Sequence, residues 1–501
     1  MCNDCTVPCH ERPLRCAVTR AAATMALCAL AGCAAGPDFR APQAPDVDRY
    51  TPLPLPPQTV AAGGDAQRFL AGHDVPQRWW TTFGNAELDR RVELALTHSP
   101  TIASARAALR QAEETAAAAG GARFPSVDAS AGATREKGAS VRAGAASGSA
   151  GPLTVYNVGV DVGYVLDIFG GVRRSVEALQ AQADLQRAQL DATYLALAAN
   201  VIAASLQEAS LREQVNATGL IVASLQEELA IAQKQQAIGA KSLADTLAVR
   251  SQLSRTQASL APLEQQLASI RNQLATYLGV TPAQLELQPV SLDDVTLPVD
   301  VPVSLPSTLV ARRPDIRAAA ATLHAATAQV GVATAGMLPQ VSLSASAGSS
   351  ALHADELFAA GTGAWSVGAS LLQPLFHGGE LRHRRRAAQA AMEQASADWQ
   401  QVVLTAFRNV ADSLQALEYD ARSLEAQATA ARDAEQLLSL TRTQYRVGAT
   451  GYLALLAAEQ QFQESRIALI QARASRLADT AALYTALGGD GWQGELSAEA
   501  Q

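Results

Sequence analysis

The stretch VSLSASAG, residues 341–348, alternates apolar with small or polar residues, and VDASAGAT, residues 127–134, does the same. Alternation with a period of two is typical of a strand with one apolar face. Each stretch leads into a loop rich in Gly, Ser and Ala and then into a second alternating segment. The sequence therefore predicts two β-hairpins, with strands at about 126–134, 155–168, 340–349 and 364–376.

The two hairpins belong to an internal duplication. Pro100 and Pro314 each open a helical segment and lie 214 positions apart (314 − 100), and the same shift relates Pro125 to Pro339. A period of this length is too long for a solenoid repeat and indicates two equivalent halves. The predicted division is repeat 1 at 67–280, a proline-rich irregular connector at 281–306 and repeat 2 at 307–489.

Very long helical segments without proline follow the hairpins, at about 171–237 and about 379–446. At 1.5 Å per residue each would be about 100 Å long, which is unusual in a globular domain. Apolar residues recur every three or four positions, a pattern typical of coiled-coil-like packing. Second helices are predicted at about 243–278, where Pro262 is expected to interrupt the register, and at about 452–487.

The N-terminus has the plan of a secretory signal, residues 1–32, which ends in Leu-Ala-Gly before Cys33. This ending resembles a bacterial lipobox, in which the signal is cleaved before the cysteine and the new N-terminal residue is acylated. Cys33 is therefore predicted to carry a covalent lipid such as palmitate, and the alternative is an ordinary signal peptide that contains a cysteine. Residues 33–66 are predicted to form an extended tether and residues 490–501 a C-terminal tail.

Composition and motifs argue against several function classes. The 501 residues include 39 Lys and Arg against 47 Asp and Glu, and a net charge of −8 gives no general reason to bind nucleic acid. No run of 18 apolar residues follows the signal, so a mature protein that spans a membrane would do so as a closed barrel. The histidines are not spaced as metal ligands, and no catalytic motif occurs in the sequence. We therefore predict that the chain is not an enzyme and holds no cofactor beyond the lipid on Cys33.

Four strands cannot close a membrane barrel, since the smallest have about eight. The strand edges must therefore be completed by other subunits. A dimer would give eight strands and a filled interior, whereas a trimer would give twelve and room for a conduit, which the polar and glycine positions favour. The predicted fold class is an α+β membrane protein, an internally duplicated protomer with four β-strands and very long α-helices that trimerises into a 12-stranded β-barrel.

Six motifs occur in order along the chain: GPDF at 36–39, WWTTF at 79–83, LDIFG at 166–170, RRPDI at 312–316, PLFHGG at 374–379 and YRVG at 445–448. With the duplication, they resemble the outer membrane factor family, the TolC-like efflux ducts, and specifically its lipidated branch. The resemblance implies an outer-membrane barrel and an α-barrel that extends through the periplasm to an adaptor (membrane fusion) protein and an inner-membrane pump of the RND type. The implied function is a passive gated exit duct for small molecules such as drugs, toxic compounds or metals.

Two other hypotheses remain open at this stage. One is a lipid-anchored coiled-coil scaffold or adhesin without a conduit, and the other is a duct of the same architecture for protein or polysaccharide secretion. A pore would fractionate with the outer membrane even after Cys33→Ser, because the barrel itself inserts, whereas a tethered scaffold would be released.

The resemblance also implies a periplasmic gate beside the glycines of the two helix turns. Asp245 and Tyr445 match gate positions of the family, and Lys241 and Arg446 are candidate partners of Asp245. Thr450 occupies a position at which some members carry arginine. The alternative is that Asp245 is a solvated helix residue and Tyr445 a packing residue.

Basic residues follow the hairpins at predicted helix starts, where the helix dipole disfavours positive charge. We expect them to contact anionic lipid headgroups, at about 1 kcal/mol per residue near the surface, and the alternative is a solvated face of mixed charge. The residues are Arg173, Arg174, Arg382, Arg384, Arg385 and Arg386.

Overall fold

The structure, a computed structural model, describes residues 34–54, 56–62, 66–137 and 152–488, and the chain divides into two compact units. The predicted signal at 1–32, the lipid site Cys33 and the tail at 490–501 lie outside the described residues. Each unit takes segments from both repeats. Unit 1 takes the described residues of Met1–Ala41, Arg110–Asp184 and Ala320–Ala397, and unit 2 takes those of Pro42–Leu109, Leu185–Ala319 and Asp398–Gln501.

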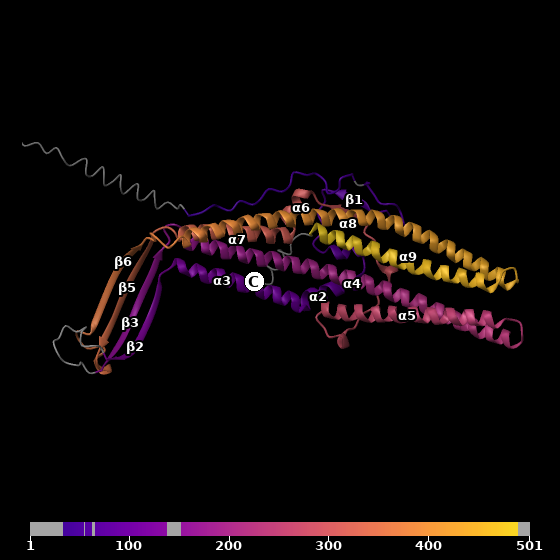
Figure 1. The fold of residues 1–501 in the computed structure, drawn as a ribbon, viewed down its shortest axis with the longest axis horizontal. Helices are drawn as coiled ribbons and strands as arrows, with labels where there is room; N and C mark the ends of the chain where they lie inside the picture. The colour runs from indigo at the N-terminus through magenta and orange to yellow at the C-terminus, as the bar shows by residue number, and fades with distance from the viewer. Residues whose placement is uncertain (1–33, 55, 63–65, 138–151, 489–501) are drawn as a thin grey trace, which may run out of the picture. The chain divides into compact units, whose positions relative to one another are not determined.

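Unit 1 contains a four-stranded antiparallel sheet in the order β2-β3-β5-β6 (Figure 1). Because β3 pairs with β5, for example Val160 with Ala347, the hairpins of the two repeats form one continuous sheet. Among the described residues, β2 and β6 each pair with one strand and form the two edges. The strands are β2 (Ser126–Glu136), β3 (Leu153–Leu166), β5 (Gln340–Ala351) and β6 (Gly363–Leu372).

The two faces of this sheet differ in chemistry. On one face, the hydroxyl of Ser342 on β5 hydrogen-bonds that of Ser370 on β6, with 2.7 Å between the oxygens. The alternate positions of β6 carry large apolar side chains that are exposed in the single chain, namely Trp365, Val367 and Leu371. Because side chains alternate along a strand, the sheet has a small polar face and an unpartnered apolar face.

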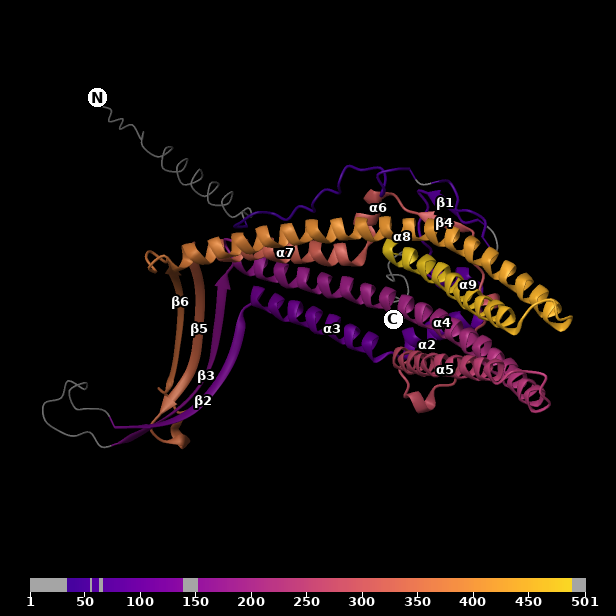
Figure 2. The same ribbon diagram turned by 45° about the vertical axis from the view of Figure 1, so that its right-hand side comes forward.

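Two helices of 67 residues each follow the hairpins, α4 (Gly171–Ala237) and α8 (Glu380–Arg446). In both views α5 runs back beside α4 and α9 runs back beside α8 (Figure 2). Each repeat therefore contributes one helical hairpin, most of which belongs to unit 2 and whose long helix begins in unit 1. The shorter helices are α3 (Pro100–Gly120) and α7 (Pro314–Ala335) before the strands, and α5 (Leu243–Tyr277) and α9 (Tyr452–Leu487) after the long helices.

The expected interruption at Pro262 does not occur, because α5 continues from Leu243 to Tyr277 with Pro262 inside it. A proline removes one amide donor and so leaves the carbonyl four residues earlier without its helical partner. That carbonyl belongs to Ala258, and both Ala258 and Pro262 are exposed. Water can therefore satisfy the freed carbonyl, and the helix tolerates the proline.

Unit 2 also contains elements that the sequence did not predict. The connector, expected to be irregular, contributes β4 (Asp300–Val303), which pairs in parallel with β1 (Arg68–Ala71). The short helices α2 (Ala86–His98) and α6 (Pro306–Arg312) were missed as well. Strands of four residues are too short to establish a period, and the pairing joins segments more than 200 positions apart, so no local pattern indicates it.

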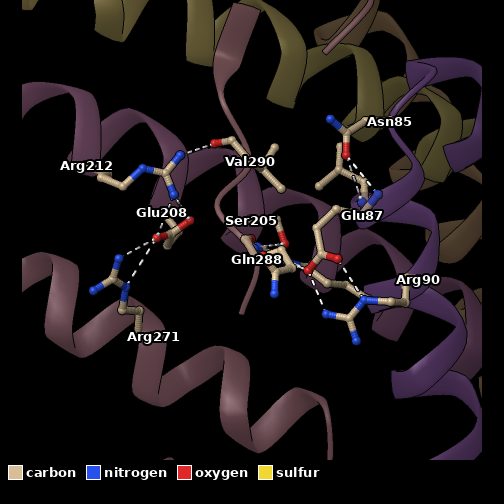
Figure 3. A network of polar contacts seen from close by, with 11 residues as sticks. Asn85, Glu87, Arg90, Ser205, Glu208, Arg212, Arg271, Gln288 and Val290 are labelled. Carbon is tan, nitrogen blue, oxygen red and sulfur yellow. Dashed lines mark hydrogen bonds and ion pairs between the residues drawn. The ribbon is translucent and has the colours of Figure 1, made fainter. Parts of the chain in front are cut away.

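Buried charges attach the connector to the helices of unit 2. Glu208 on α4 is 1% exposed and accepts hydrogen bonds from Arg212, at 3.3 Å, and from Arg271 on α5, at 3.0 Å (Figure 3). Arg212 also donates to the carbonyl oxygen of Val290 in the connector. The carboxylate therefore holds two arginines in place, and one of them binds the connector backbone.

Arg91 on α2 supplies a second attachment nearby. Its guanidinium is fully buried and donates to Ser205 at 3.1 Å, to the carbonyl oxygen of Gln288 at 2.6 Å and to Glu87 at 3.0 Å. Burial lowers the pKa of Arg91, and Glu87 and Glu208 oppose that shift. Both groups of contacts hold the connector by its backbone, so we assign them a structural role.

No helix within the described ranges combines the length and the apolar character that crossing a bilayer requires.

Candidate functional site at the helix turns

The two helical hairpins end in turns of the same geometry, both in unit 2. Gly239 follows α4 with φ +77° and Gly448 follows α8 with φ +76°, a left-handed conformation that glycine adopts without steric cost. The amide of Ala240 donates to the carbonyl of Gln235 at 2.8 Å, and the corresponding amide of Ala449 does the same in the second turn at 2.9 Å. The duplication thus produces two matching C-terminal caps.

The side chains that meet at these turns differ between the repeats. Lys241, in the first turn, places its Nζ 4.3 Å from the ring centre of Tyr452 and 5.3 Å from that of Tyr445. The two tyrosine rings lie edge to face with centres 5.8 Å apart. A cation over aromatic faces is attracted by about 0.5–2 kcal/mol, depending on desolvation. Two predicted gate candidates, Lys241 and Tyr445, therefore contact each other across the repeats.

Asp245 takes a different partner from those expected. Ser242 and Asp245 form a capping box at the start of α5, in which the Ser242 hydroxyl donates to the Asp245 carboxylate at 2.7 Å and the Asp245 amide donates to the Ser242 hydroxyl at 3.2 Å. The Ser242 hydroxyl and the Ser242 amide, which donates to the same carboxylate at 3.2 Å, lower the pKa of Asp245. Within the described single chain, no ion pair joins Asp245 to Lys241 or Arg446. The carboxylate is satisfied locally, as a cap.

The other two candidates lie on the second turn. Arg446, the last residue of α8, donates to the Thr443 hydroxyl at 3.2 Å on the same helix. Thr450 lies between Gly448 and the start of α9. Neither contributes to the contact of Lys241 with the tyrosines.

A second link between the hairpins involves residues that the sequence did not single out. The Tyr452 hydroxyl donates to Glu228 on α4 at 3.1 Å and links the hairpins. Within the second hairpin, Arg442 on α8 donates to Glu459 on α9 at 3.2 Å. Glu459 is 5% exposed. Burial and then the carboxyl group of Glu228 raise the pKa of Glu459 to about 7, and Arg442 opposes the shift. Glu459 can therefore hold a proton near neutral pH.

We call Lys241, Glu228, Arg442, Tyr445, Tyr452 and Glu459 the latch, because they join the two helical hairpins of one chain. A cavity of about 570 Å³ lies beside it and is lined in part by Glu435, Arg446 and Phe462. Polar groups line much of this cavity, so water can reach the latch. Two carboxyl groups that meet in the fold have no sequence motif, which is why Glu228 and Glu459 were missed. The position of Tyr452 directly after the second turn was a signal that could have indicated its role.

The arginines expected at lipid headgroups divide into two sets. Arg174 is 4% exposed and binds Asp38 at 2.6 Å and Glu177 at 2.8 Å, so its charge is already neutralised inside unit 1, and the headgroup prediction fails for it. Arg173 lies 3.4 Å from the Asp167 carboxylate and remains partly exposed.

The set on α8 remains at the surface. Arg384 pairs with Glu380 at 2.5 Å, and both side chains are exposed. Arg382 and Arg386 are exposed, and Arg385 is partly buried. For these four arginines, contact with lipid headgroups stays a prediction.

The match to a known protein family is also duplicated along the chain. The family described as outer membrane efflux protein matches the chain twice, over residues 92–280 and 305–489. The two matches fall on the two repeats, which confirms the internal duplication.

Within the described residues, no group of His, Cys, Asp and Glu side chains is arranged to hold a metal ion.

Individual relatives cover nearly the whole chain. The pyoverdine export outer membrane protein OpmQ of Pseudomonas aeruginosa is 31% identical over 89% of this chain and 94% of its own length. The probable outer membrane lipoprotein SilC of Salmonella typhimurium is 25% identical over 92% of this chain and 96% of its own. The open-state structure of the Neisseria gonorrhoeae MtrE outer membrane channel superposes with a TM-score of 0.78 at 25% identity, covering 91% of this chain and 98% of that one. The chain belongs to the outer membrane efflux protein family.

Proposed function

We propose that this protein is the outer-membrane exit duct of a tripartite efflux system. Three copies would join their sheets edge to edge, and a periplasmic adaptor would connect the duct to an inner-membrane pump of the RND type. The observation that carries the proposal is the sheet of unit 1, which has two open edges, an exposed apolar face and a small polar face. Three sheets of four strands would make twelve, which leaves room for a conduit lined by serine and glycine.

The duct would be passive. Transport direction and energy would come from the pump, and we propose neither catalysis nor a resident cofactor for this chain. OpmQ is named for pyoverdine export, and export of small molecules is accordingly the class of cargo that we propose here. The arginines on α8 would contact anionic lipid headgroups at the membrane surface.

The latch would close the duct at the helix turns. It joins the α4–α5 hairpin to the α8–α9 hairpin through a cation on two rings, through the hydrogen bond from Tyr452 to Glu228, and through Glu459, which stays protonated beside Glu228 up to about pH 7. Opening would separate the hairpins and break these contacts. Asp245, Arg446 and Thr450 lie beside the latch and would contact neighbouring subunits or the adaptor. The MtrE channel of Neisseria gonorrhoeae is known in an open state, which supports a family in which the channel adopts more than one state.

Native mass spectrometry of the detergent-extracted protein, followed by conductance in planar bilayers, tests the proposal. We expect three copies per particle and a channel of low open probability. A monomer or dimer without conductance would leave the strands unable to enclose a conduit and would favour a lipid-anchored scaffold.

We also propose that Cys33 carries a covalent lipid, as the lipobox indicates and as the lipoprotein name of SilC supports. Cys33→Ser should abolish incorporation of labelled fatty acid while the protein still fractionates with the outer membrane, because the assembled sheet inserts by itself. Fractionation in sucrose gradients, with fluorescence detection of an alkyne-labelled fatty acid, measures both. Release of the Cys33→Ser protein into the soluble fraction would contradict the inserted duct and leave only a tethered protein.

The open probability should rise several-fold between pH 5.5 and pH 8. The pKa of Glu459 is raised from 4.5 to about 7 in the closed latch, so the latch is most stable below about pH 4.5 and loses that stability as the pH rises through about 7. Above this range Glu459 becomes a carboxylate beside Glu228, and Arg442 offsets only part of the added negative charge. Single-channel recording across this pH range measures the effect.

Two variants separate the latch from other titrating groups. Glu459→Gln keeps the side chain neutral and should hold the channel at low open probability up to pH 8. Glu464→Gln, on an exposed part of the same helix, should retain the pH response of the unmodified protein. An unchanged pH response in Glu459→Gln would exclude this carboxyl pair as its source.

A further inference from the structure

The first described residues of the chain are fixed to unit 1. The Ala35 amide donates to the carbonyl oxygen of Phe169 at 2.9 Å, and the Ala35 carbonyl accepts from Arg174 at 3.2 Å. Asp38 binds the same guanidinium at 2.6 Å, and Phe39 stacks on His324 with ring centres 4.3 Å apart. The segment is therefore held by its backbone, by an ion pair and by an aromatic contact.

Glycines allow this segment to approach α7 closely. A Cβ on Gly36, whose φ is +91°, would lie 2.5 Å from the Cα of Gly331. A Cβ on Gly331 would lie 2.7 Å from the Ala35 carbonyl oxygen. Contacts this short leave no room for a side chain at either position, so the path of the backbone up to Ala34 is closely determined.

An apolar groove of about 260 Å³ lies at the junction of β3 with α4 and of α7 with β5. Its only carboxylate among the lining residues is that of Asp167, which accepts from the amides of Val172 at 2.9 Å and Arg173 at 2.8 Å and so caps α4. That charge is committed to the helix. The remaining lining is mostly apolar and includes Val165, Leu166, Ile168, Phe169, Val332 and Ala335.

The groove begins where the described chain begins. Phe169 lines the groove and also accepts the hydrogen bond of Ala35. A Cβ on Gly170 would lie 3.0 Å from the Cα of Ala34, and the next residue, Gly171, again lines the groove. The residue before Ala34 is Cys33, so a chain attached to Cys33 starts within about one residue of the groove wall.

We propose that this groove binds an acyl chain carried by Cys33. The inference rests on the proposed lipidation of Cys33. An acyl chain tethered at the edge of an apolar groove is present there at high effective concentration, and burying its methylene groups against valine, leucine and phenylalanine is favourable. The acyl chain would then pack in the groove of the protein instead of lying wholly in the bilayer. This packing would hold the N-terminus against unit 1.

Photo-crosslinking on the full-length protein in cells tests this site. Cells would be supplied with a palmitic acid that carries a terminal alkyne and a diazirine, irradiated, and the purified protein digested for mass spectrometry. We expect the labelled chain on Cys33 to crosslink to peptides within 165–172 and 332–340. Crosslinks confined to bilayer lipids, or to segments away from these two, would overturn the proposal.

The alkyne shows whether Cys33 is acylated, independently of whether the acyl chain binds in the groove. Absence of fluorescence from the unmodified protein would show that Cys33 carries no acyl chain, whereas fluorescence without groove crosslinks would show a lipid located elsewhere. Groove crosslinks that persist in Cys33→Ser would identify a free membrane lipid as the occupant and refute attachment through Cys33.

A variant that fills the groove with a larger side chain tests the binding of the acyl chain independently. Val332→Trp should displace the chain and reduce the groove crosslinks by most of their yield, whereas Ala333→Trp, at the neighbouring position outside the groove lining, should leave them unchanged. Retained crosslinking in a folded Val332→Trp protein would argue against the groove. If this variant does not fold, the comparison between the unmodified protein and Cys33→Ser still decides the question.

Discussion

Glu208→Gln should lower the free energy of unfolding by about 3 kcal/mol, because it removes a buried negative charge that two arginines share. Glu208 is 1% exposed and binds both Arg212 and Arg271. Arg212 is mostly buried, whereas Arg271 is about half exposed and water can recover part of its interaction, so the loss lies at the lower end of the range for buried pairs. Thermal or denaturant unfolding of the detergent-solubilised protein measures it.

The matched control is Glu227→Gln on an exposed part of the same helix, which should shift the unfolding midpoint by little. Proteolysis adds a local readout. Because Arg212 binds the carbonyl of Val290, the variant should expose the connector around 288–290 to protease before the helices unfold. Equal midpoints for the two variants would show that the buried carboxylate contributes no stability.

Lys241→Ala should raise the ratio of open to closed channels by a factor of about 2–30. One cation over an aromatic ring contributes about 0.5–2 kcal/mol, and each 1.4 kcal/mol changes the ratio of two populations about tenfold. The Lys241 ammonium lies over both Tyr445 and Tyr452, and its loss removes a contact between the two hairpins. Single-channel open probability in planar bilayers measures the change.

Two further variants make the interpretation specific. Lys234→Ala removes an exposed lysine near the end of α4 and should leave the open probability unchanged. Lys241→Arg keeps a cation that can lie over the rings and should stay close to the unmodified protein. If Lys241→Ala and Lys234→Ala behave alike, the contact with the tyrosines does not hold the channel closed.

The long elements could be predicted from the sequence because their patterns extend over many residues. Alternation at 341–348 and 127–134 indicated the hairpin strands, and the absence of proline from α4 and α8 indicated their length. The pairing of β1 with β4 could not be predicted, since four-residue strands carry no usable period. Pro262 was misjudged because its effect depends on the exposure of a carbonyl, which the sequence does not give.

The candidate site was predicted in part. The resemblance brought attention to Lys241 and Tyr445, which do meet. It also offered Lys241 and Arg446 as candidate partners of Asp245, which is instead capped by Ser242 in the described chain. The Ser-x-x-Asp pattern of Ser242 and Asp245 is a capping box and could have indicated the local partner. Arg174 was assigned to the surface because a run of charges does not reveal which member is buried.

The matching glycine turns also have a consequence for how the duplicated chain is organised. The backbone of the two turns is the same, yet the first supplies a cation and a carboxyl-bearing helix, while the second supplies the rings and the opposing carboxyl group. Each repeat therefore carries half of a contact that it cannot make with a copy of itself. A ring assembled from six copies of either repeat alone would have the same turns but no latch. Fusion of two diverged copies into one polypeptide ensures that the complementary halves always occur together, in equal number and side by side.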